Sequence, residues 1–373
     1  MSVQVLDGVA ARWRDHVGDD VPILASAPWL DATLGRFAGR RLTFLATEEG
    51  RGGGLQATVV DSAAAGEMIN LYQTLLADPK VWKFPEESLA ARGGLRAEAP
   101  PGECWLPHIA VLYPGFDSFV AASGGSTPAL TATLVDAVLS WAREHEMKAV
   151  SFPYVTSDAG LSKVLAERGF RSIPLTFRSR VTVNASFDGY LASLSTNGRS
   201  QVNRERRRLA AAGVRTMRCA FDEVCQDVVA LRCDLVERYG QKAEKDREEA
   251  TLRALVSCFG TDQVRLYCSF LDGRLVGFSL GLVWGDTWLF LYTGTYQRPQ
   301  TSAVYFDHFV YAPIAGAISE GARVVDMGIG AWEGKRRRGC ELTPVNLWAR
   351  GLDPVIDQAI SRAAVPMRRE VGW

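Results

Sequence analysis

The sequence lacks the clusters of reactive residues on which several enzyme classes depend. It has four histidines, and none of its seven cysteines forms a Cys-x-x-Cys pair. We therefore predict no metal site and no disulfide framework, and we interpret the cysteines as reduced and mostly buried. A Walker loop and a Gly-x-Gly-x-x-Gly motif are also missing, which argues against P-loop enzymes and Rossmann dehydrogenases.

Net charge and long hydrophobic runs are missing as well. Lys+Arg and Asp+Glu both number 42, so the molecule as a whole does not attract nucleic acid, DNA is not an expected partner, and anions must be bound by local clusters. No apolar run approaches the roughly 20 residues that span a bilayer. The first residues have no basic region followed by an apolar core, so we expect no signal peptide and a cytoplasmic protein without a membrane span.

What is present is a repeated pattern of helices and strands. With 373 residues, the chain is long enough for two domains. Three apolar or alternating runs, separated by Asp272-Gly273 and Gly285-Asp286, predict an antiparallel meander over residues 263–294. In the first half, residues 42–48 indicate a strand, and the glycine run at 50–54 is interpreted as a turn.

A helix followed by an apolar strand occurs in both halves of the chain. The first copy has a helix over 127–146 and a strand over 148–155, and the second has a helix over 301–322 and a strand over 323–330. Each could be an ordinary crossover. Together with the meander, they predict two mixed α/β domains, residues 1–176 and 177–373.

The stretch DMGIGAWEGKRRRGCE, residues 326–341, places four consecutive cations in a glycine-rich segment directly after an apolar strand. Lys335 to Arg338 could be no more than a solvated loop. Their position favours a ligand site, because open α/β sheets bind ligands beyond the carboxyl ends of their strands. The glycines also allow a ligand to approach the backbone closely.

The meander, the helix and the strand GARVVDMGIG together resemble the GNAT acyltransferase fold. The C-terminal half is similar to the Fem-type branch, whose members have two GNAT-like domains in one chain. Asp326, Gly328 and Gly330 match the strand end of the Fem-type pattern, and Lys335 matches its lysine, four residues before a glycine. Gly334 and Arg338 depart from the aromatic and the phenylalanine of that pattern. The resemblance covers roughly residues 130–350.

The resemblance implies transfer of an aminoacyl group from charged tRNA to an amine or hydroxylamine, in a cell-wall peptide or in a small antibiotic precursor. It implies no resident cofactor. One alternative is an acyl-CoA-dependent N-acyltransferase, with the CoA thioester as co-substrate. Another is a non-catalytic GNAT-like module that binds an anion. The segment 292–309, where a GNAT enzyme would hold CoA, offers Arg298 but no Arg-x-x-Gly-x-Gly/Ala cluster, which favours a donor other than CoA.

By resemblance, Lys335 is the best candidate for a catalytic residue. Its ammonium would stabilise the oxyanion that forms on the donor carbonyl, and removal of such a group commonly slows a reaction about 10²–10³-fold. Arg336, Arg337 and Arg338 would anchor the CCA end or the diphosphate of the donor.

A basic helix supplies a second cluster of positive charge. Residues 199–218 contain seven arginines and one acid, Glu205. Arg204, Arg207 and Arg208 lie on one helical face. This face could simply be solvated, or it could bind donor phosphates without reading bases, in which case salt would weaken the binding.

A general base and the residues of the substrate pocket are less well defined by the sequence. Asp326 and His308 are candidate bases, although Asp326 could cap a turn and His308 could be a core residue. Substrate-assisted deprotonation would need no base. Tyr292, Tyr296 and Trp332 are candidate pocket residues, and Trp332 could stack on a nucleobase.

Overall fold

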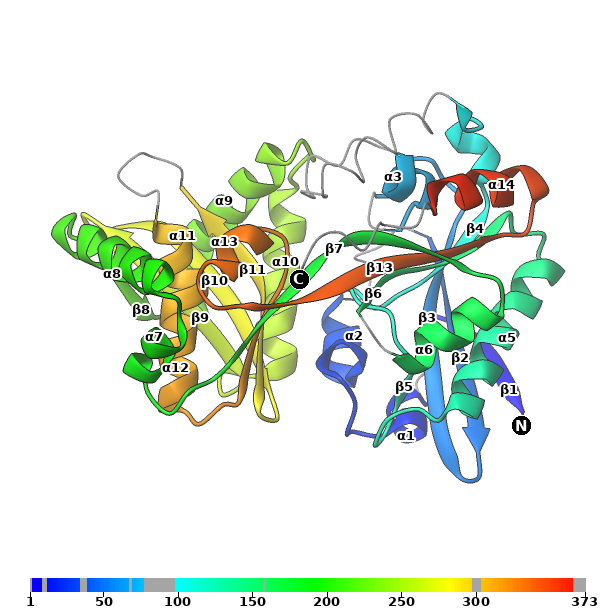
Figure 1. Cartoon of the computed structure of the whole chain (residues 1–373), viewed down its shortest axis with the longest axis horizontal. Helices are drawn as coiled ribbons and strands as arrows, with labels where there is room; N and C mark the ends of the chain where they lie inside the picture. Colours follow the sequence, from blue (N-terminus) through cyan, green and yellow to red (C-terminus); the bar gives the residue numbers. More distant parts are fainter. Residues whose placement is uncertain are drawn as a thin grey trace. The chain divides into compact units, whose positions relative to one another are not determined.

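A computed structural model describes residues 2–8, 12–33, 39–66, 69–76, 98–156, 159–296 and 303–364. The chain forms two compact units, one of residues 1–176 and 344–373 and the other of residues 177–343 (Figure 1). The sequence-based division placed all of 177–373 in one domain. The difference arises because the strand Glu341–Gly351 pairs, from Val345 on, with a strand of the first unit.

The first unit is built on a mixed sheet in the order β1-β2-β3-β4-β6-β13, with β5 paired to β3. Its strands are β1 (Val3–Asp7), β2 (Arg40–Glu48), β3 (Arg51–Val60), β4 (His108–Val111), β5 (Ala121–Ala122), β6 (Ala149–Thr156) and β13 (Glu341–Gly351). Its helices are α1 (Trp13–Val17), α2 (Ala27–Thr33), α3 (Leu71–Leu76), α5 (Pro128–Glu144), α6 (Ala159–Glu167) and α14 (Pro354–Ala363), with 3₁₀ turns η1 (Ile23–Ala25) and η2 (Gly102–Trp105). The expected helix over 127–146 is confirmed by α5, which Thr127 caps through the amide of Leu130.

The interpretation of residues 50–54 as a turn is wrong. Only Gly50 lies in the turn, and Gly52 to Gly54 belong to β3. Glycine is required in this strand because α1 packs directly on it: a Cβ on Gly52 would lie 1.8 Å from the His16 carbonyl oxygen, and one on Gly54 would lie 2.6 Å from the Trp13 ring.

The second unit has a six-stranded sheet in the order β7-β12-β11-β10-β9-β8. Its strands are β7 (Arg171–Thr182), which begins in the first unit, β8 (Arg215–Arg218), β9 (Val264–Leu271), β10 (Arg274–Trp284), β11 (Thr287–Thr295) and β12 (Val324–Ile329). Its helices are α7 (Phe187–Ser193), α8 (Thr196–Ala211), α9 (Phe221–Arg238), α10 (Lys245–Phe259), α11 (Val304–Phe306), the π-helical η4 (Asp307–Tyr311), α12 (Ala312–Ser319) and α13 (Trp332–Arg336).

The predicted meander is confirmed by β9, β10 and β11, which pair antiparallel in chain order. A bulge interrupts the β10–β11 register, because Leu280 lies opposite Tyr292 and Gly281 opposite Phe290. The extra residue between them, Leu291, reverses which face the following side chains occupy. Phe290 therefore packs with the η4 and α12 side chains, whereas the Tyr292 ring lies 5.5 Å from the Arg232 guanidinium carbon on α9.

The parallel pairing of β11 and β12 is short. It covers three positions and ends at Leu289 and Asp326, although both strands continue. Gly328 has a φ of +62°, a conformation that glycine adopts without steric cost and that breaks the regular strand. Beyond Leu289 and Asp326, β11 and β12 no longer pair with each other. The backbone groups on the facing sides of these strand ends can therefore bond other partners.

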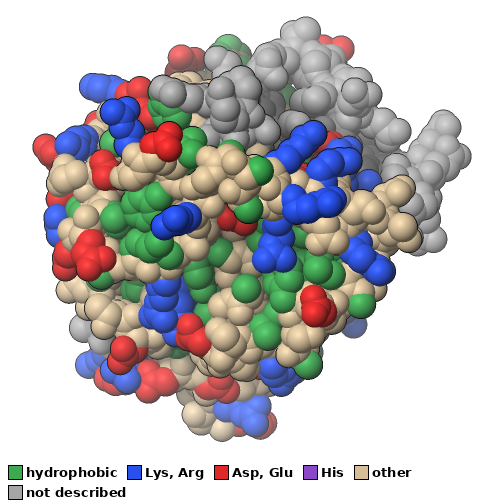
Figure 2. Space-filling view, turned by 90° about the vertical axis from the view of Figure 1, so that its left-hand side faces the viewer, with side chains coloured by type: hydrophobic (Ala, Val, Ile, Leu, Met, Phe, Trp, Pro, Cys, Tyr) green, Lys and Arg blue, Asp and Glu red, His purple; other side chains and the backbone are tan. Residues whose placement is uncertain are grey.

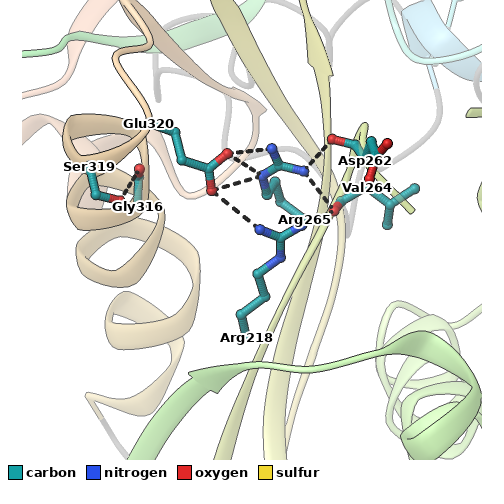
Figure 3. A network of polar contacts seen from close by, with 7 residues as sticks. All are labelled: Arg218, Asp262, Val264, Arg265, Gly316, Ser319 and Glu320. Atoms are coloured by element: carbon teal, nitrogen blue, oxygen red, sulfur yellow. Dashed lines mark hydrogen bonds and ion pairs between the residues drawn. The ribbon is translucent and has the colours of Figure 1, made fainter. Parts of the chain in front are cut away.

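A charged network ties the end of α12 to the sheet of the same unit. Glu320 accepts hydrogen bonds from Arg265 on β9 and from Arg218 on β8, and Arg265 also donates to the carbonyls of Asp262 and Val264 (Figure 3).

No helix among the described residues is long and apolar enough to cross a membrane.

Candidate functional site

The glycine-rich segment after β12 forms a short helix, α13, rather than an open turn. Left-handed backbone at Ala331 (φ +46°) precedes it, and Gly339 (φ +83°) follows it. One turn of helix distributes the four cations over two faces. Lys335 and Arg338 point inward and are 1% and 3% exposed, whereas Arg336 and Arg337 are exposed.

Lys335 reaches from α13 to the end of β12. Its Nζ donates a hydrogen bond of 2.6 Å to the carbonyl oxygen of Met327, just beyond the last position at which β12 pairs with β11. The ammonium also lies 4.9 Å from the centre of the Phe309 ring. Burial lowers the pKa of Lys335 from 10.5 to about 8, because an ammonium loses hydration there. The amine is still mostly protonated at neutral pH and can exchange a proton readily at slightly higher pH.

Asp326 is buried at the end of β12 and is held by two arginines of β7. Arg178 and Arg180 donate to the same carboxylate oxygen at 2.7 and 2.8 Å, and the amide of Gly328 donates to the other oxygen. Burial alone would raise the pKa of Asp326, but the two guanidinium groups outweigh it and hold the pKa below its ordinary value. Asp326 is thus an ionised anchor that fixes the strand end, and its role as a base stays a prediction.

Arg338 connects α13 to the basic helix α8. It donates to both carboxylate oxygens of Glu205, at 2.5 and 3.2 Å, and to the Tyr311 hydroxyl at 2.8 Å. Tyr311 in turn donates to Glu205, and Arg338 also bonds the carbonyl of Gly334. The one acid within the basic helix therefore neutralises the buried Arg338, which lies in the turn after α13, and the proposed phosphate contact of Arg338 stays a prediction.

The two basic segments that the sequence singled out lie next to each other. Besides the Glu205–Arg338 pair, the backbone of α8 approaches the turn after α13 so closely that a Cβ on Gly198 would lie 3.1 Å from the Arg337 carbonyl oxygen. Figure 2 views the side where α8 is drawn in Figure 1, and it shows Lys and Arg side chains gathered towards the upper right with few acidic ones between them. Six of the exposed arginines of the two segments are Arg204, Arg206, Arg207, Arg208, Arg336 and Arg337. We call these six residues the basic surface.

His308 lies in η4 and is completely buried. Its Nε2 is 3.0 Å from the Thr295 hydroxyl, and its Nδ1 has no hydrogen-bond partner. Burial lowers the pKa of His308 to about 3, so the imidazole is neutral and only weakly basic. The structure places His308 in the core between η4 and β10, where its ring is 2.6 Å from the position of a Cβ on Gly277. Its role as a base stays a prediction.

The three candidate pocket residues do not share one location. Tyr292 is buried on the α9 face of β11, as the bulge dictates. Tyr296 is 41% exposed, at the end of the meander. Trp332 begins α13, and its ring centre lies 4.9 Å from that of Phe177. Arg298 of the expected donor loop lies outside the described residues.

The pentapeptide Gly277-Phe278-Ser279-Leu280-Gly281 matches the Gly-x-Ser-x-Gly pattern of serine hydrolases. Here it lies inside β10 rather than at a strand-to-helix turn, which is the context such a nucleophile needs. Ser279 is buried, and its hydroxyl donates to the backbone carbonyl of His308, not to the imidazole. The pattern is thus a strand segment and not a nucleophile elbow.

Sequence reasoning missed four residues of this region: Arg178, Arg180, Glu205 and Tyr311. Two arginines at alternate positions of an apolar strand, at 178 and 180, would have indicated a buried acidic partner. Glu205 was noted only as a charge among arginines. Nothing in the sequence distinguishes Tyr311 from other aromatic residues of its helix.

The fold and the site define a tandem GNAT-fold protein with acyltransferase architecture. The profile of the FemAB-like family, described as peptidoglycan biosynthesis/recognition, matches residues 116–371. The chain therefore belongs to the FemAB-like family, a family of acyltransferases. Among curated proteins, a sequence search found no significant match.

Two solved structures have the same fold along almost the whole chain. The structure of FemX aligns with a TM-score of 0.59 and 13% identity, covering 95% of this chain and 99% of that chain. A tandem GNAT protein from the clavulanic acid biosynthesis pathway, solved without AcCoA, aligns with a TM-score of 0.50 and 12% identity, covering 98% of this chain and 100% of that chain. At such identities the likeness concerns the fold alone.

Proposed function

We propose that this protein transfers an aminoacyl group from charged tRNA to an amine or hydroxylamine acceptor. The acceptor would be a peptidoglycan-type peptide or a small-molecule precursor. Charged tRNA is a cytoplasmic substrate, so the proposed reaction would take place in the cytoplasm. The bond that breaks is the ester to the tRNA ribose, and the bond that forms joins the acyl carbon to the acceptor nitrogen. The acceptor loses a proton, and the ribose oxygen gains one.

One observation carries the proposal: a buried lysine stands beside the basic surface, at the place where the parallel strands β11 and β12 stop pairing with each other. Lys335 bonds the Met327 carbonyl oxygen at this strand end, and α8, which carries four arginines of the basic surface, contacts the turn directly after the helix of Lys335. An ammonium there would stabilise a donor oxyanion, and the arginines would hold the phosphates of the acceptor stem. The family's description, peptidoglycan biosynthesis/recognition, agrees with an aminoacyl acceptor of that type.

An acyl-CoA donor is the second candidate, because GNAT folds commonly use it and the basic surface would also suit a diphosphate. The tandem GNAT protein of the clavulanic acid pathway, whose structure was solved without AcCoA, shares the fold and keeps this candidate relevant. A non-catalytic module that binds an anion is the third. The first two candidates predict different acyl donors at the basic surface, and the third predicts a bound anion without acyl transfer.

The test is transfer by the purified full chain from labelled aminoacyl-tRNAs or from acetyl-CoA to a panel of amines and peptidoglycan precursor peptides. We expect product with aminoacyl-tRNA only, and a loss of about 10²–10³-fold in rate for Lys335→Ala. Arg274→Gln, which removes an exposed arginine at the start of β10, is the control. Transfer from acetyl-CoA alone would replace the proposed donor, and anion binding without turnover by any donor would contradict an enzymatic role.

A further inference from the structure

The amine of Lys335 is withdrawn from solvent in this conformation. The residue is 1% exposed, and its Nζ bonds the Met327 carbonyl. A group that stabilises an oxyanion must come within about 3 Å of that oxygen. The proposed function therefore requires α13 to shift so that Lys335 exchanges its backbone partner for the substrate.

The segment that carries Lys335 is bounded by bends on both sides. Gly328, Gly330 and Ala331 before α13, and Gly339 after it, all have φ values between +46° and +87°. Such positions interrupt the regular backbone, so the short helix between them is not the continuation of either strand. Residues 331–339 can therefore move as one piece with small changes at these ends.

Contacts with three other helices hold this piece in place: Tyr190 of α7 donates to the Arg338 carbonyl, the Arg338 guanidinium donates to Tyr311 of η4, and a third contact joins it to α8. Arg338 lies three residues after Lys335, and its guanidinium is fixed by both carboxylate oxygens of Glu205 on α8. Burial alone would raise the pKa of Glu205, but its hydrogen bonds to Arg338 and Tyr311 lower it, so the pair is ionised. Glu205 is flanked in sequence by Arg204 and Arg206 of the basic surface.

We propose that Glu205 is a positioning residue: its ion pair with Arg338 keeps α13 closed over Lys335, and a polyphosphate bound on the basic surface releases it. This inference rests on the proposed function, because exposure of Lys335 matters only if its amine acts on the donor. The release itself depends on the Glu205–Arg338 ion pair. A phosphate group is a second partner for guanidinium groups at this place and repels the carboxylate of Glu205. Donor binding and exposure of the catalytic amine are thus coupled through one carboxylate.

The coupling can be measured without any acyl transfer, by the rate at which an amine-acylating reagent modifies Lys335. The modification is read by mass spectrometry of the full-length protein after digestion, with the exposed Lys245 of α10 as the internal reference. A charge-assisted hydrogen bond stabilises by an amount that corresponds to about ten- to hundredfold in an equilibrium. We expect Glu205→Gln to increase the rate at Lys335 by at least about tenfold while Lys245 reacts as in wild type.

The matched control is Glu320→Gln, because Glu320 also pairs with an arginine whose side chain is buried, Arg265, but in the network of α12 and β9. It is expected to leave the rate at Lys335 unchanged. Circular dichroism of both variants monitors folding, and Glu205→Asp, which keeps the charge on a shorter side chain, is expected to react at a rate between those of wild type and Glu205→Gln.

Two anions identify the phosphate source in the wild-type protein, namely uncharged tRNA and CoA, each added separately. Acceleration by tRNA supports the proposal and the tRNA donor. Acceleration by CoA but not by tRNA supports the positioning role of Glu205 and contradicts the proposed donor. The proposal is overturned if neither anion accelerates the reaction, if folded Glu205→Gln reacts like wild type, or if Glu320→Gln reacts as fast as Glu205→Gln.

Discussion

Three charged side chains between residues 326 and 338 are buried, and the protein balances their charges differently. Asp326 has two arginine partners, and Arg338 has a carboxylate partner. Lys335 bonds only a neutral carbonyl among the hydrogen bonds the structure gives it. A buried charge without an ion-pair partner is costly, so we expect Lys335 to lower the stability of the folded protein while its amine is protonated.

Lys335 makes stability depend on pH in the alkaline range. Its pKa is about 8 in the folded protein against an ordinary value of 10.5, so below pH 8 both states carry the proton and the buried charge opposes folding. Between these two values the unfolded chain binds more protons, and the free energy of unfolding rises with pH. We expect the wild type to gain on the order of 3 kcal/mol relative to Lys335→Met across this window. Urea unfolding at several pH values checks this, and a constant difference would contradict it.

Asp326 is expected to contribute strongly to stability because its buried carboxylate accepts hydrogen bonds from both Arg178 and Arg180, and Asp326→Asn removes the negative charge that these guanidinium groups face. Asp326→Asn should cost about 3–5 kcal/mol in the free energy of unfolding. The pKa of Asp326 is lowered, so this contribution is present above the ordinary value of 3.8 and is lost as pH falls through the folded-state pKa. Urea unfolding at pH 7 measures the effect. Asp286→Asn, at an exposed pair with Arg323, should cost less than about 1 kcal/mol, and equal losses would contradict the prediction.

At this scale the sequence predicted which cations and acids gather near residue 335, but not what they touch. Asp326 and Arg338 were both selected from the pattern after the strand. Their partners Arg178 and Glu205 lie 148 and 133 positions away along the chain, and only the packing of strands and helices brings them together. Pairing over such separations depends on tertiary structure and leaves no local pattern in one sequence.

Among the elements, α8 has a buried apolar side and an exposed basic side, and both are visible in its sequence. Val202 and Leu209 are buried, while the arginines at 204, 207 and 208 are exposed. The helix thus packs on one side and presents positive charge on the other.

Replacing Arg204, Arg207 and Arg208 by glutamine should weaken tRNA binding and also flatten its dependence on salt. Each lost phosphate contact reduces the slope of log K against log salt by roughly 0.7–0.9. Filter binding of tRNA between low and moderate salt measures both quantities. A triple variant of Arg51, Arg171 and Arg274, which are exposed elsewhere, removes the same formal charge. Equal effects of the two variants would mean that net charge, and not α8, governs binding.

Elements with a strong local signal were predicted well, and the exceptions have local reasons. The meander was predicted because Asp272-Gly273 and Gly285-Asp286 mark its turns. Gly52 to Gly54 were misassigned because glycine serves there to admit α1, which sequence alone does not reveal. The helix α13 was missed because its five residues lie among glycines and are too few for a helical pattern.

At the scale of the whole chain, the second unit is an insertion in the first. The chain leaves the first unit at residue 176 and returns to it at 344. From Val345 to Gly351, β13 pairs with β6, and Ile356 and Ile360 of α14 are buried. Sequence analysis could not predict this return, because the strand 341–351 has the same apolar pattern whichever sheet it joins.

A fragment of residues 177–343 is expected to fold, since it contains every strand pair from β7 to β8 of the second unit. A fragment of residues 1–343 should keep that unit and lose protection in β6, whose partner β13 is missing. Hydrogen exchange read by mass spectrometry on both fragments and on the full chain distinguishes these outcomes. Full protection of β6 in the 1–343 fragment, or an unfolded 177–343 fragment, would contradict the predicted division.

This insertion has a consequence for the order of events on the ribosome. Domains usually fold in the order in which they are synthesised. Here the first unit cannot complete its fold when residues 1–176 have been synthesised, because β6 lacks its partner β13 until residues 344–351 have left the exit tunnel. The part encoded later can complete its own core while the earlier part is still open, so translation that stalls shortly before residue 344 would release a protein with a finished second unit and an exposed β6 edge.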